Sequence, residues 1–546
     1  MRSSFASCLV LFAFMLVSRA AEPTHIEQRG ATRQLIVDGQ PFLVLGGELH
    51  NSSSTSRAFM KPAWPHLAEM HLNTVLAAVP WDVIEPAEGK FDFTMVDQLI
   101  EDARAHHLRL ILLWFGSWKN GFSHYIPEWV KRDAARFPRA RIKAGTVEIL
   151  STFSDANSAA DAKAFAALMR HVRSIDEAQH TVVMVQVENE VGLHGDSRDR
   201  LPAAETAFNQ PVARELLDFL TSHRENLLPE MRALWQSTGF KAAGTWAEVF
   251  GRSPAADEAF MGWHYARYVD RVTAAGKAEY ALPMFVNAWI VQLADESPGE
   301  YPSGGPQAHM LDLWRAGAPH LDLLCPDIYR SNFTEICAQF TRSGNTLFVP
   351  ESRGGEVGPA NAFVAIGRFN SIGYSPFGID AEPDPASGPL HQAYEVLAQL
   401  APLILEHQAM HTISAVSLDK QNASEKILLG GYVLQTGLLP SRRTNQMPER
   451  GFGLMLATGP DEFIVAGSDL QVSFATEAGD ETVGLGPVEE GVFENGKWIP
   501  GRRLNGDEIM ISYDVPALVA AHQTGTGLRL PSGQPTILRV KLYRFR

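Results

Sequence analysis

The segment "VVMVQVENEVG", Val182 to Gly192, is an apolar run that ends in three polar residues, Glu188, Asn189 and Glu190. Its β-branched residues predict a short strand. A nearly continuous apolar strand, rather than an alternating one, is typical of a parallel sheet covered on both faces. The segment therefore predicts a buried strand whose carboxyl end carries two carboxylates and an amide.

Seven other segments have the same character, and helical segments lie between them. In "FTMVDQLIEDARAHH" and "AADAKAFAALMRHVRSI", for example, apolar residues recur every three to four positions, as in helices that pack on a sheet. Eight such strand–helix units predict an α/β fold, a (β/α)8 TIM barrel, over residues 21–400. The eight predicted strands are "FLVLGGELH" from Phe42, "NTVLAAVPW" from Asn73, "RLILLWFGSW" from Arg109, "TVVMVQVENE" from Thr181, "LPMFVNAW" from Leu282, "LDLLCPDIY" from Leu321, "NTLFVPES" from Asn345 and "SIGYSPFGID" from Ser371.

A different pattern begins near Ala401, where the helical periodicity fades. Short runs such as "FIVAGSDLQVSFAT" and "TILRVKLYRFR" alternate like half-exposed antiparallel strands, and pairs of turn-forming residues separate such runs. We therefore predict a C-terminal antiparallel β-sandwich domain over residues 405–546. No low-complexity linker precedes it, so we expect it to pack firmly against the barrel. The turn pairs are Gly430-Gly431, Asn495-Gly496 and Asn505-Gly506.

Composition narrows the class of partner. The 546 residues include 47 basic and 62 acidic ones, a formal net charge of −15, which disfavours nucleic acid and anionic lipid as partners and favours a neutral ligand. Residues 1–20 resemble a signal peptide, with Arg2 before the apolar run "CLVLFAFMLV" and a cleavage site expected after Ala20. We expect a periplasmic or secreted protein with no membrane association after cleavage. Cys325 and Cys337 are either two buried thiols or one disulfide.

Two carboxylates at predicted strand ends indicate a chemistry. Glu190 follows strand four and Glu351 ends strand seven, and residues at the carboxyl ends of barrel strands meet at one mouth. A pair about 5–5.5 Å apart suits retaining glycoside hydrolysis, in which one carboxylate is the nucleophile and the other is first acid and then base. Repulsion by ionised Glu351 would keep Glu190 protonated. Taken alone, an Asn-Glu at a strand end is more often a helix cap or a surface group.

Other residues at the same strand ends are candidates for contact with a sugar. Asn189 could bind a 2-hydroxyl, while Glu188, on the face of the strand that Glu190 shares, more plausibly supports the site from beneath. The aromatic candidates could stack on pyranose rings, although core packing is the alternative for each tryptophan. No spacing typical of a metal or nucleotide site was found, so we expect no metal and no cofactor. The remaining candidates for substrate binding are Glu48, His50, Trp81, Trp118, Asn287, Trp289 and Tyr329.

With these residues placed, the chain resembles glycoside hydrolase family 35, the retaining β-galactosidases, over roughly residues 30–395. "VQVENEVG" is similar to that family's acid/base motif and "VPWDVIEPAEGKFDF" to its strand-two motif. The resemblance implies acid/base Glu190, sugar-binding Asn189, nucleophile Glu351 and an exo-acting β-galactosidase. It also makes a plant cell-wall oligosaccharide a plausible substrate. The chain departs from the family at three places in the sugar-binding wall, at Ala78, Gly116-Ser117 and Ser352.

The sequence is also compatible with two alternative functions. One is a retaining exo-glycosidase of the same clan with another specificity, such as an arabinosidase or a β-glucosidase. The other is a non-catalytic carbohydrate-binding barrel, which has no need of two mutually repelling carboxylates. The C-terminal domain could bind glycan, but a structural role is the simpler expectation because Trp498 is the one tryptophan in it.

Overall fold

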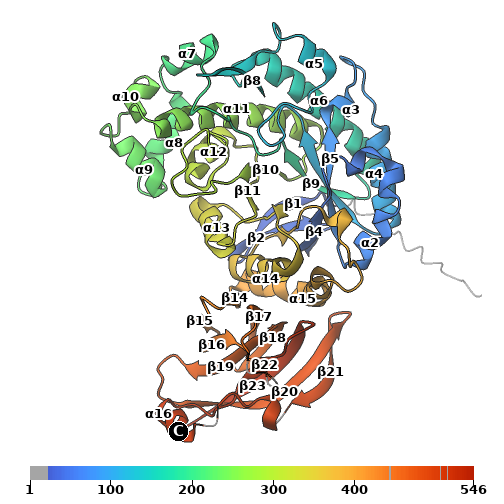
Figure 1. The fold of residues 1–546 in the computed structure, drawn as a ribbon, viewed down its shortest axis with the longest axis vertical. Coiled ribbons are helices and arrows are strands. Elements are labelled where there is room, and N and C mark those ends of the chain that lie inside the picture. The colour runs from blue at the N-terminus through green and yellow to red at the C-terminus, as the bar shows by residue number, and fades with distance from the viewer. Residues whose placement is uncertain (1–21, 442–443, 445, 505, 513) are drawn as a thin grey trace, which may run out of the picture.

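The computed structural model describes residues 22–441, 444, 446–504, 506–512 and 514–546. The predicted signal peptide lies outside these residues. Eight parallel strands form one sheet in the order β12-β11-β10-β9-β6-β5-β4-β13 (Figure 1). Each of the eight predicted segments contributes one of them, so the predicted barrel is confirmed. The strands are β4 (Val44–Glu48), β5 (Thr74–Pro80), β6 (Arg109–Phe115), β9 (Val182–Val187), β10 (Met284–Trp289), β11 (Leu323–Ile328), β12 (Glu351–Ser352) and β13 (Gly373–Tyr374).

The sheet closes between its first and last strands. A parallel bridge pairs Val349 with Tyr374, and the Ser375 amide donates a 3.0 Å hydrogen bond to the Val349 carbonyl. The seventh strand is short, and Pro350, which lacks an N–H donor, directly precedes it. The closure brings the carboxyl end of β12, and with it Glu351, into the ring of strand ends.

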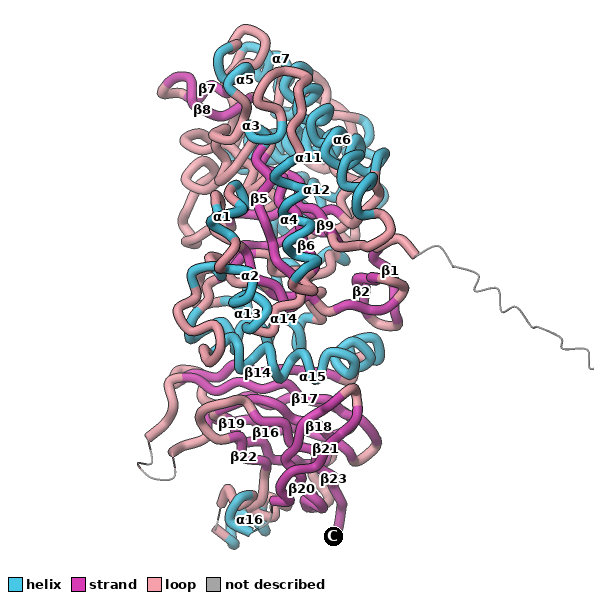
Figure 2. Tube along the Cα trace, turned by 90° about the vertical axis from the view of Figure 1, so that its right-hand side faces the viewer, coloured by secondary structure: helices cyan, strands magenta, loops and turns pink. Residues whose placement is uncertain are grey.

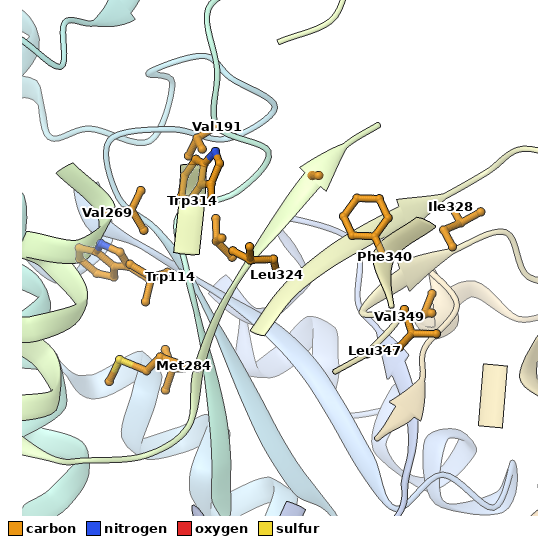
Figure 3. Close-up of a cluster of buried hydrophobic side chains, with 14 of the residues drawn as sticks. Trp114, Val191, Val269, Met284, Trp314, Leu324, Ile328, Phe340, Leu347 and Val349 are labelled. Carbon is orange, nitrogen blue, oxygen red and sulfur yellow. The ribbon is translucent and has the colours of Figure 1, made fainter. Parts of the chain in front are cut away.

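Helices surround the barrel, and an apolar core fills the space between them and the strands. Figure 3 shows part of this core, where Trp114 from β6, Met284 from β10 and Leu324 from β11 pack with Val269 from α11. The helices are α1 (Arg57–Met60), α2 (Ala63–Glu69), α3 (Trp81–Ile84), α4 (Thr94–Ala105), α5 (Glu128–Arg132), α6 (Asp155–Asp176), α7 (Pro202–Phe208), α8 (Arg214–Ser222), α9 (Pro229–Gln236), α10 (Trp246–Phe250), α11 (Pro254–Glu279), α12 (Leu311–Gly317), α13 (Phe333–Phe340), α14 (Gly358–Phe369) and α15 (Pro389–Met410).

A small antiparallel sheet precedes the first barrel strand and was not predicted. It consists of β1 (His25–Arg29), β2 (Thr32–Val37) and β3 (Gln40–Phe42). Leu35 and Val37 belong to the same buried cluster as side chains inside the barrel. Asp38 and Gly39 both have positive φ at the β2–β3 turn, so the Asp-Gly pair was a hairpin signal that the sequence carried. A second hairpin, β7 (Arg139–Ile142) with β8 (Gly145–Leu150), lies in the loop after β6.

The C-terminal region forms two antiparallel sheets, as the sequence predicted. Gly430-Gly431 and Asn495-Gly496 form positive-φ turns between paired strands, whereas Asn505 lies outside the described residues. A short helix, α16 (Val515–Ala520), follows β21. One sheet contains β14 (Ile413–Asp419), β17 (Arg450–Gly459), β18 (Glu462–Ser468), β23 (Thr536–Phe545), β20 (Thr482–Glu494) and β21 (Lys497–Leu504); the other contains β15 (Ser424–Leu429), β16 (Tyr432–Leu438), β19 (Leu470–Thr476) and β22 (Leu528–Leu530).

The two halves share a core. Helices α14 and α15 lie between the barrel and the sandwich (Figure 2), and buried residues of β14 and β17 belong to the same apolar cluster as the barrel helices. The rings of Phe363 and Phe452 meet edge to face, with 4.9 Å between their centroids. Cys325 and Cys337 are both buried and unpaired. No helix of the described residues is long and apolar enough to span a membrane.

Candidate active site

Five buried polar side chains from five strand ends gather at the carboxyl end of the barrel. Glu48 ends β4, Asn287 lies in β10, Asp327 lies in β11 and Glu351 begins β12. Glu190 follows β9, and oxygen atoms of Glu190, Asp327 and Glu351 all lie within 4.8 Å of one another. Residues that are far apart in the sequence thus lie in one cluster.

The backbone after β9 is unusual. Both Glu188 and Glu190 have positive φ, 64° and 49°. This conformation is uncommon for residues other than glycine, so the surrounding contacts must stabilise it. The Asn189 amide donates to the Trp118 carbonyl at 3.3 Å, and the Glu190 amide donates to Asn287 Oδ1 at 2.9 Å. In a regular strand, neighbouring residues such as Asn189 and Glu190 would point to opposite faces, and the left-handed residues break this alternation.

Glu351 is held by a tyrosine. The Tyr329 hydroxyl donates a 2.5 Å hydrogen bond to Glu351 Oε1. The other oxygen, Oε2, is buried and has no hydrogen-bond partner among the described residues. Burial and the negative charge of Glu351 raise the pKa of Tyr329 well above its usual range, so the hydroxyl keeps its proton and continues to donate. The Tyr329 hydroxyl therefore fixes one oxygen of Glu351 in position.

Asp327 is a site residue that the sequence analysis missed. It accepts a 2.6 Å hydrogen bond from Asn287 Nδ2, and Asn287 in turn accepts from the Glu190 amide. The register of β11 and β12 places Asp327 beside Glu351. The segment "LDLLCPDIY" did carry a signal, because Asp327 is an acidic residue near the end of an otherwise apolar strand.

Burial and mutual repulsion determine the protonation of the cluster. Burial, followed by the negative charge of Glu351, raises the pKa of Glu190 to about 7, while the nearby Lys119 ammonium lowers it. Burial and the Glu351 carboxylate also raise the pKa of Glu48 and of Asp327 well above the usual range. Lys119, which is 6% exposed, was not singled out in the sequence. The cluster therefore combines a carboxyl that titrates near neutrality with others that hold protons.

A second buried network supports the first from beneath. Asp161 accepts hydrogen bonds from Trp114 Nε1 at 2.9 Å and from the Ser117 hydroxyl at 2.5 Å. Glu188 accepts from the Trp118 amide at 2.8 Å, and burial together with the Asp161 charge raises the pKa of Glu188. A Cβ atom on Gly116 would lie 2.7 Å from Glu188 Oε1 and 2.9 Å from Asp161 Oδ1, so this network has room only for glycine.

Two of the aromatic residues predicted to contact a sugar are fully buried in the structure. Trp81 is fully buried, packs against Trp114 and Trp129, and donates to Glu85 at 2.9 Å. Trp118 is also fully buried, with its ring against Tyr265 and Tyr268. The faces of both indoles are thus covered by other rings, although Trp118 Nε1 has no hydrogen-bond partner among the described residues. Trp118 acts on the site through its backbone, which bonds Glu188 and Asn189.

Trp289, His50 and Asn189, which were also predicted to bind substrate, differ in their exposure to solvent. Trp289 ends β10 and is partly exposed, with its ring edge-to-face against His194. His50 is exposed at the rim, and its Nδ1 lies 3.0 Å from Asp380, an acidic residue that the sequence analysis did not single out. Asn189 Oδ1 accepts from the Asn120 amide at 3.2 Å.

Several buried polar atoms of the cluster have unused hydrogen-bonding capacity. Within the described part of the chain, Glu48 Oε1, Asn189 Nδ2, Asp327 Oδ1 and Glu351 Oε2 are buried without a partner. Buried polar groups are normally paired, so such a concentration indicates a site that binds a polar ligand. The carboxylates of Glu190, Asp327 and Glu351 are also close enough to ligate a hard cation, which prefers oxygen donors.

Part of the barrel matches a known sequence family. Residues 52–235 match Glyco_hydro_42, described as "Beta-galactosidase", a region that contains Glu190 but not Glu48 or Glu351. The likeness at family level is thus to β-galactosidases of this type rather than to family 35 specifically. Residues 390–514 match a family described as a domain of unknown function, DUF5597.

Relatives with curated names align over a limited region. The chain is 28% identical over 202 residues to "Beta-galactosidase" of Xanthomonas manihotis, covering 36% of this chain and 32% of that protein. It is 28% identical over 167 residues to "Beta-galactosidase 8" of Oryza sativa subsp. japonica, covering 30% and 23%. The alignments thus span about a third or less of these relatives.

Solved structures align with the chain at low identity. A β-galactosidase from the psychrophilic Marinomonas ef1 gives a TM-score of 0.45 at 12% identity, covering 67% of this chain and 61% of that chain. The catalytic domain of a β-amylase from Paenibacillus polymyxa gives a TM-score of 0.43 at 12% identity, covering 64% and 95%.

Proposed function

We propose that this protein is a retaining, exo-acting glycoside hydrolase that releases terminal β-galactose. The observation that carries the proposal is the pairing of Glu190, whose pKa is raised to about 7, with Glu351, whose side-chain oxygen lies within 4.8 Å. Inverting enzymes need roughly 6.5–9.5 Å between carboxyl groups to accommodate a water molecule, so the short separation favours retention.

In the first step, Glu351 Oε2 attacks the anomeric carbon and forms a glycosyl ester. The bond from that carbon to the leaving oxygen breaks as Glu190 transfers its proton to the oxygen. Tyr329 holds Oε1 of the nucleophile, which leaves Oε2 free to attack.

In the second step, Glu190 acts as a base. Formation of the ester removes the negative charge of Glu351, so the repulsion that raised the pKa of Glu190 disappears. Glu190 then takes a proton from water while the water oxygen attacks the anomeric carbon. The ester bond breaks, Glu351 regains its charge, and the sugar leaves with its original anomeric configuration.

The unpartnered polar atoms support recognition of one sugar. Asn189 Nδ2 can donate to a 2-hydroxyl, while Glu48 Oε1 and Asp327 Oδ1 can accept from other hydroxyls. Glu190 and Glu351 are each only 6% exposed. Such restricted access favours a terminal residue over an internal one and thus supports exo action. The names of the curated relatives support galactose as that sugar.

We also propose a family, a substrate class and a cellular location for the protein. The motifs "VQVENEVG" and "VPWDVIEPAEGKFDF" support a place close to family 35, even though the matching model is the family 42 type. A neutral oligosaccharide, for example from plant cell walls, suits a chain with a net charge of −15. The apolar run that follows Arg2 supports export to the periplasm or beyond.

A panel of nitrophenyl glycosides tests the specificity. We expect turnover of the β-galactoside, with proton NMR showing β-galactose as the first product. Turnover of only an arabinoside or a β-glucoside would replace the sugar, and first release of the α-anomer would overturn retention. The variant Glu351→Gln should bind galactose without turnover, and activity in it would rule out Glu351 as the nucleophile.

A further inference from the structure

A cluster of metal-ligating side chains lies away from the candidate active site, between α2 and α15. His71 follows α2 by two residues, and His391 is the third residue of α15. Glu395 follows His391 by four positions, which places both on one face of that helix. One ligand atom from each of the three residues lies within 4.8 Å of the other two.

The two histidines are arranged side by side. Their ring centroids are 4.7 Å apart, with an angle of 48° between the ring planes. His391 Nδ1 lies 2.9 Å from the Glu69 carbonyl oxygen, across 322 positions of sequence. A carbonyl can only accept a hydrogen bond, so Nδ1 carries the proton and Nε2 keeps its lone pair. Orientation of a ligating histidine by a backbone carbonyl is common around protein-bound metals.

His71 is also suited to ligation. Its backbone has a φ of 59°, and it directly follows Met70, the residue that caps α2. The Glu395 carboxylate supplies a negative ligand.

We propose that His71, His391 and Glu395 bind one Zn²⁺ ion that joins α2 to α15. Two imidazoles and one carboxylate form a common three-ligand zinc set, with water in the fourth position. Ligand atoms around tetrahedral zinc lie about 3.4 Å apart. His71 is exposed and Glu395 half-buried, so both side chains have space to rotate inward from the present separation.

The position of this site suggests a structural role. Helix α15 lies between the barrel and the sandwich, whereas α2 belongs to the barrel's outer ring (Figure 2). A metal ion that joins the two helices would stabilise the folded state, because the three ligands lie far apart in the unfolded chain. No spacing in the sequence indicates this site, since its two histidines are distant in the chain. The inference is independent of the proposed hydrolase activity.

Calorimetric titration of the metal-free full chain with Zn²⁺ tests the site. We expect one equivalent to bind and to raise the midpoint of thermal unfolding by roughly 1–2 °C at about ten times the Kd. His391→Ala should abolish binding. Glu395→Gln, which keeps the size of the side chain, should weaken it. His66→Ala removes an exposed histidine of α2 and should leave binding unchanged.

Three outcomes would overturn the proposal. They are the absence of saturable Zn²⁺ binding by the wild-type chain, equal binding by the wild type and His391→Ala, and loss of binding in Glu351→Gln with retention in His391→Ala. The last would assign the ion to the carboxylate cluster of the candidate active site instead.

Discussion

The pKa of Glu190 depends on its neighbours, and Lys119 is the neighbour whose charge can be removed most directly by substitution. Burial and Glu351 raise the pKa of Glu190, while the Lys119 ammonium lowers it. The proposed acid must be protonated, so kcat/KM should fall as pH rises through about 7. Lys119→Met removes the charge that favours ionised Glu190 and should move this decline to higher pH. Lys163→Met, at an exposed position of α6, is the control; an identical profile for wild type and Lys119→Met would contradict the account.

The acid role of Glu190 has a separate signature in the leaving group. A nitrophenolate leaves without protonation, whereas an alkoxide needs it. Glu190→Gln should therefore slow cleavage of an alkyl galactoside by about 10²–10⁴-fold and slow attack on the nitrophenyl substrate much less. Values of kcat/KM on both substrates test this expectation, because kcat/KM reports the first step alone whereas kcat also contains the second step, in which Glu190 is the base. Equal losses of kcat/KM on the two would show that Glu190 does not donate a proton to the leaving group.

At the same scale, the sequence predicted the positions of acidic residues that lie at strand ends. Glu190 and Glu351 were found because apolar runs led directly to them. Lys119 could not be found in this way, because it lies in a loop after β6 and loop residues have no periodicity that fixes their direction. Burial of Trp81 and Trp118 could not be predicted in this way, since an aromatic near a strand end can turn into the core or into the pocket.

At the scale of elements, the turn after β9 depends on the buried network around Asp161. Glu188 is buried and its folded-state pKa is raised. Its contribution to stability is therefore fully present below its unfolded pKa of about 4.5 and is lost as pH rises through the folded value. Glu188→Gln keeps the acceptor for the Trp118 amide and cannot ionise, so its stability should fall less between pH 5 and pH 8.

Urea unfolding at both pH values measures the difference. Each unit of pKa shift corresponds to about 1.4 kcal/mol of unfolding free energy. Glu477→Gln, an exposed position, is the control and should follow the wild type. A pH dependence in Glu188→Gln as steep as that of the wild type would show that Glu188 does not carry this linkage.

The eight barrel strands were predictable because parallel strands are buried on both faces and read as apolar runs. Register and closure were not predictable, since they depend on pairings such as Val349 with Tyr374. The N-terminal sheet escaped notice because its strands are short and its hairpin signal is a single Asp-Gly pair.

At the scale of the whole molecule, the barrel and the sandwich should unfold together. Leu454 of β17 is fully buried in the shared core, and a Cβ placed on Gly367 of α14 would lie 3.0 Å from Leu454 Cδ1. Leu454→Ala should destabilise the protein by about 2–5 kcal/mol in a single transition. Leu428→Ala, where the side chain is 60% exposed, should change stability little. Two separate calorimetric transitions in the Leu454 variant would show that the halves are independent.

The central claim is that Glu351, among four neighbouring carboxyls, forms the covalent bond to the sugar. Incubation with a 2-deoxy-2-fluoro-β-galactosyl fluoride should accumulate the glycosyl-enzyme, because the fluorine slows its hydrolysis more than its formation. Mass spectrometry of the digested protein then locates the label. We predict a single adduct on Glu351; an adduct on Glu48, Glu190 or Asp327 instead, or inactivation without any adduct, would contradict the account.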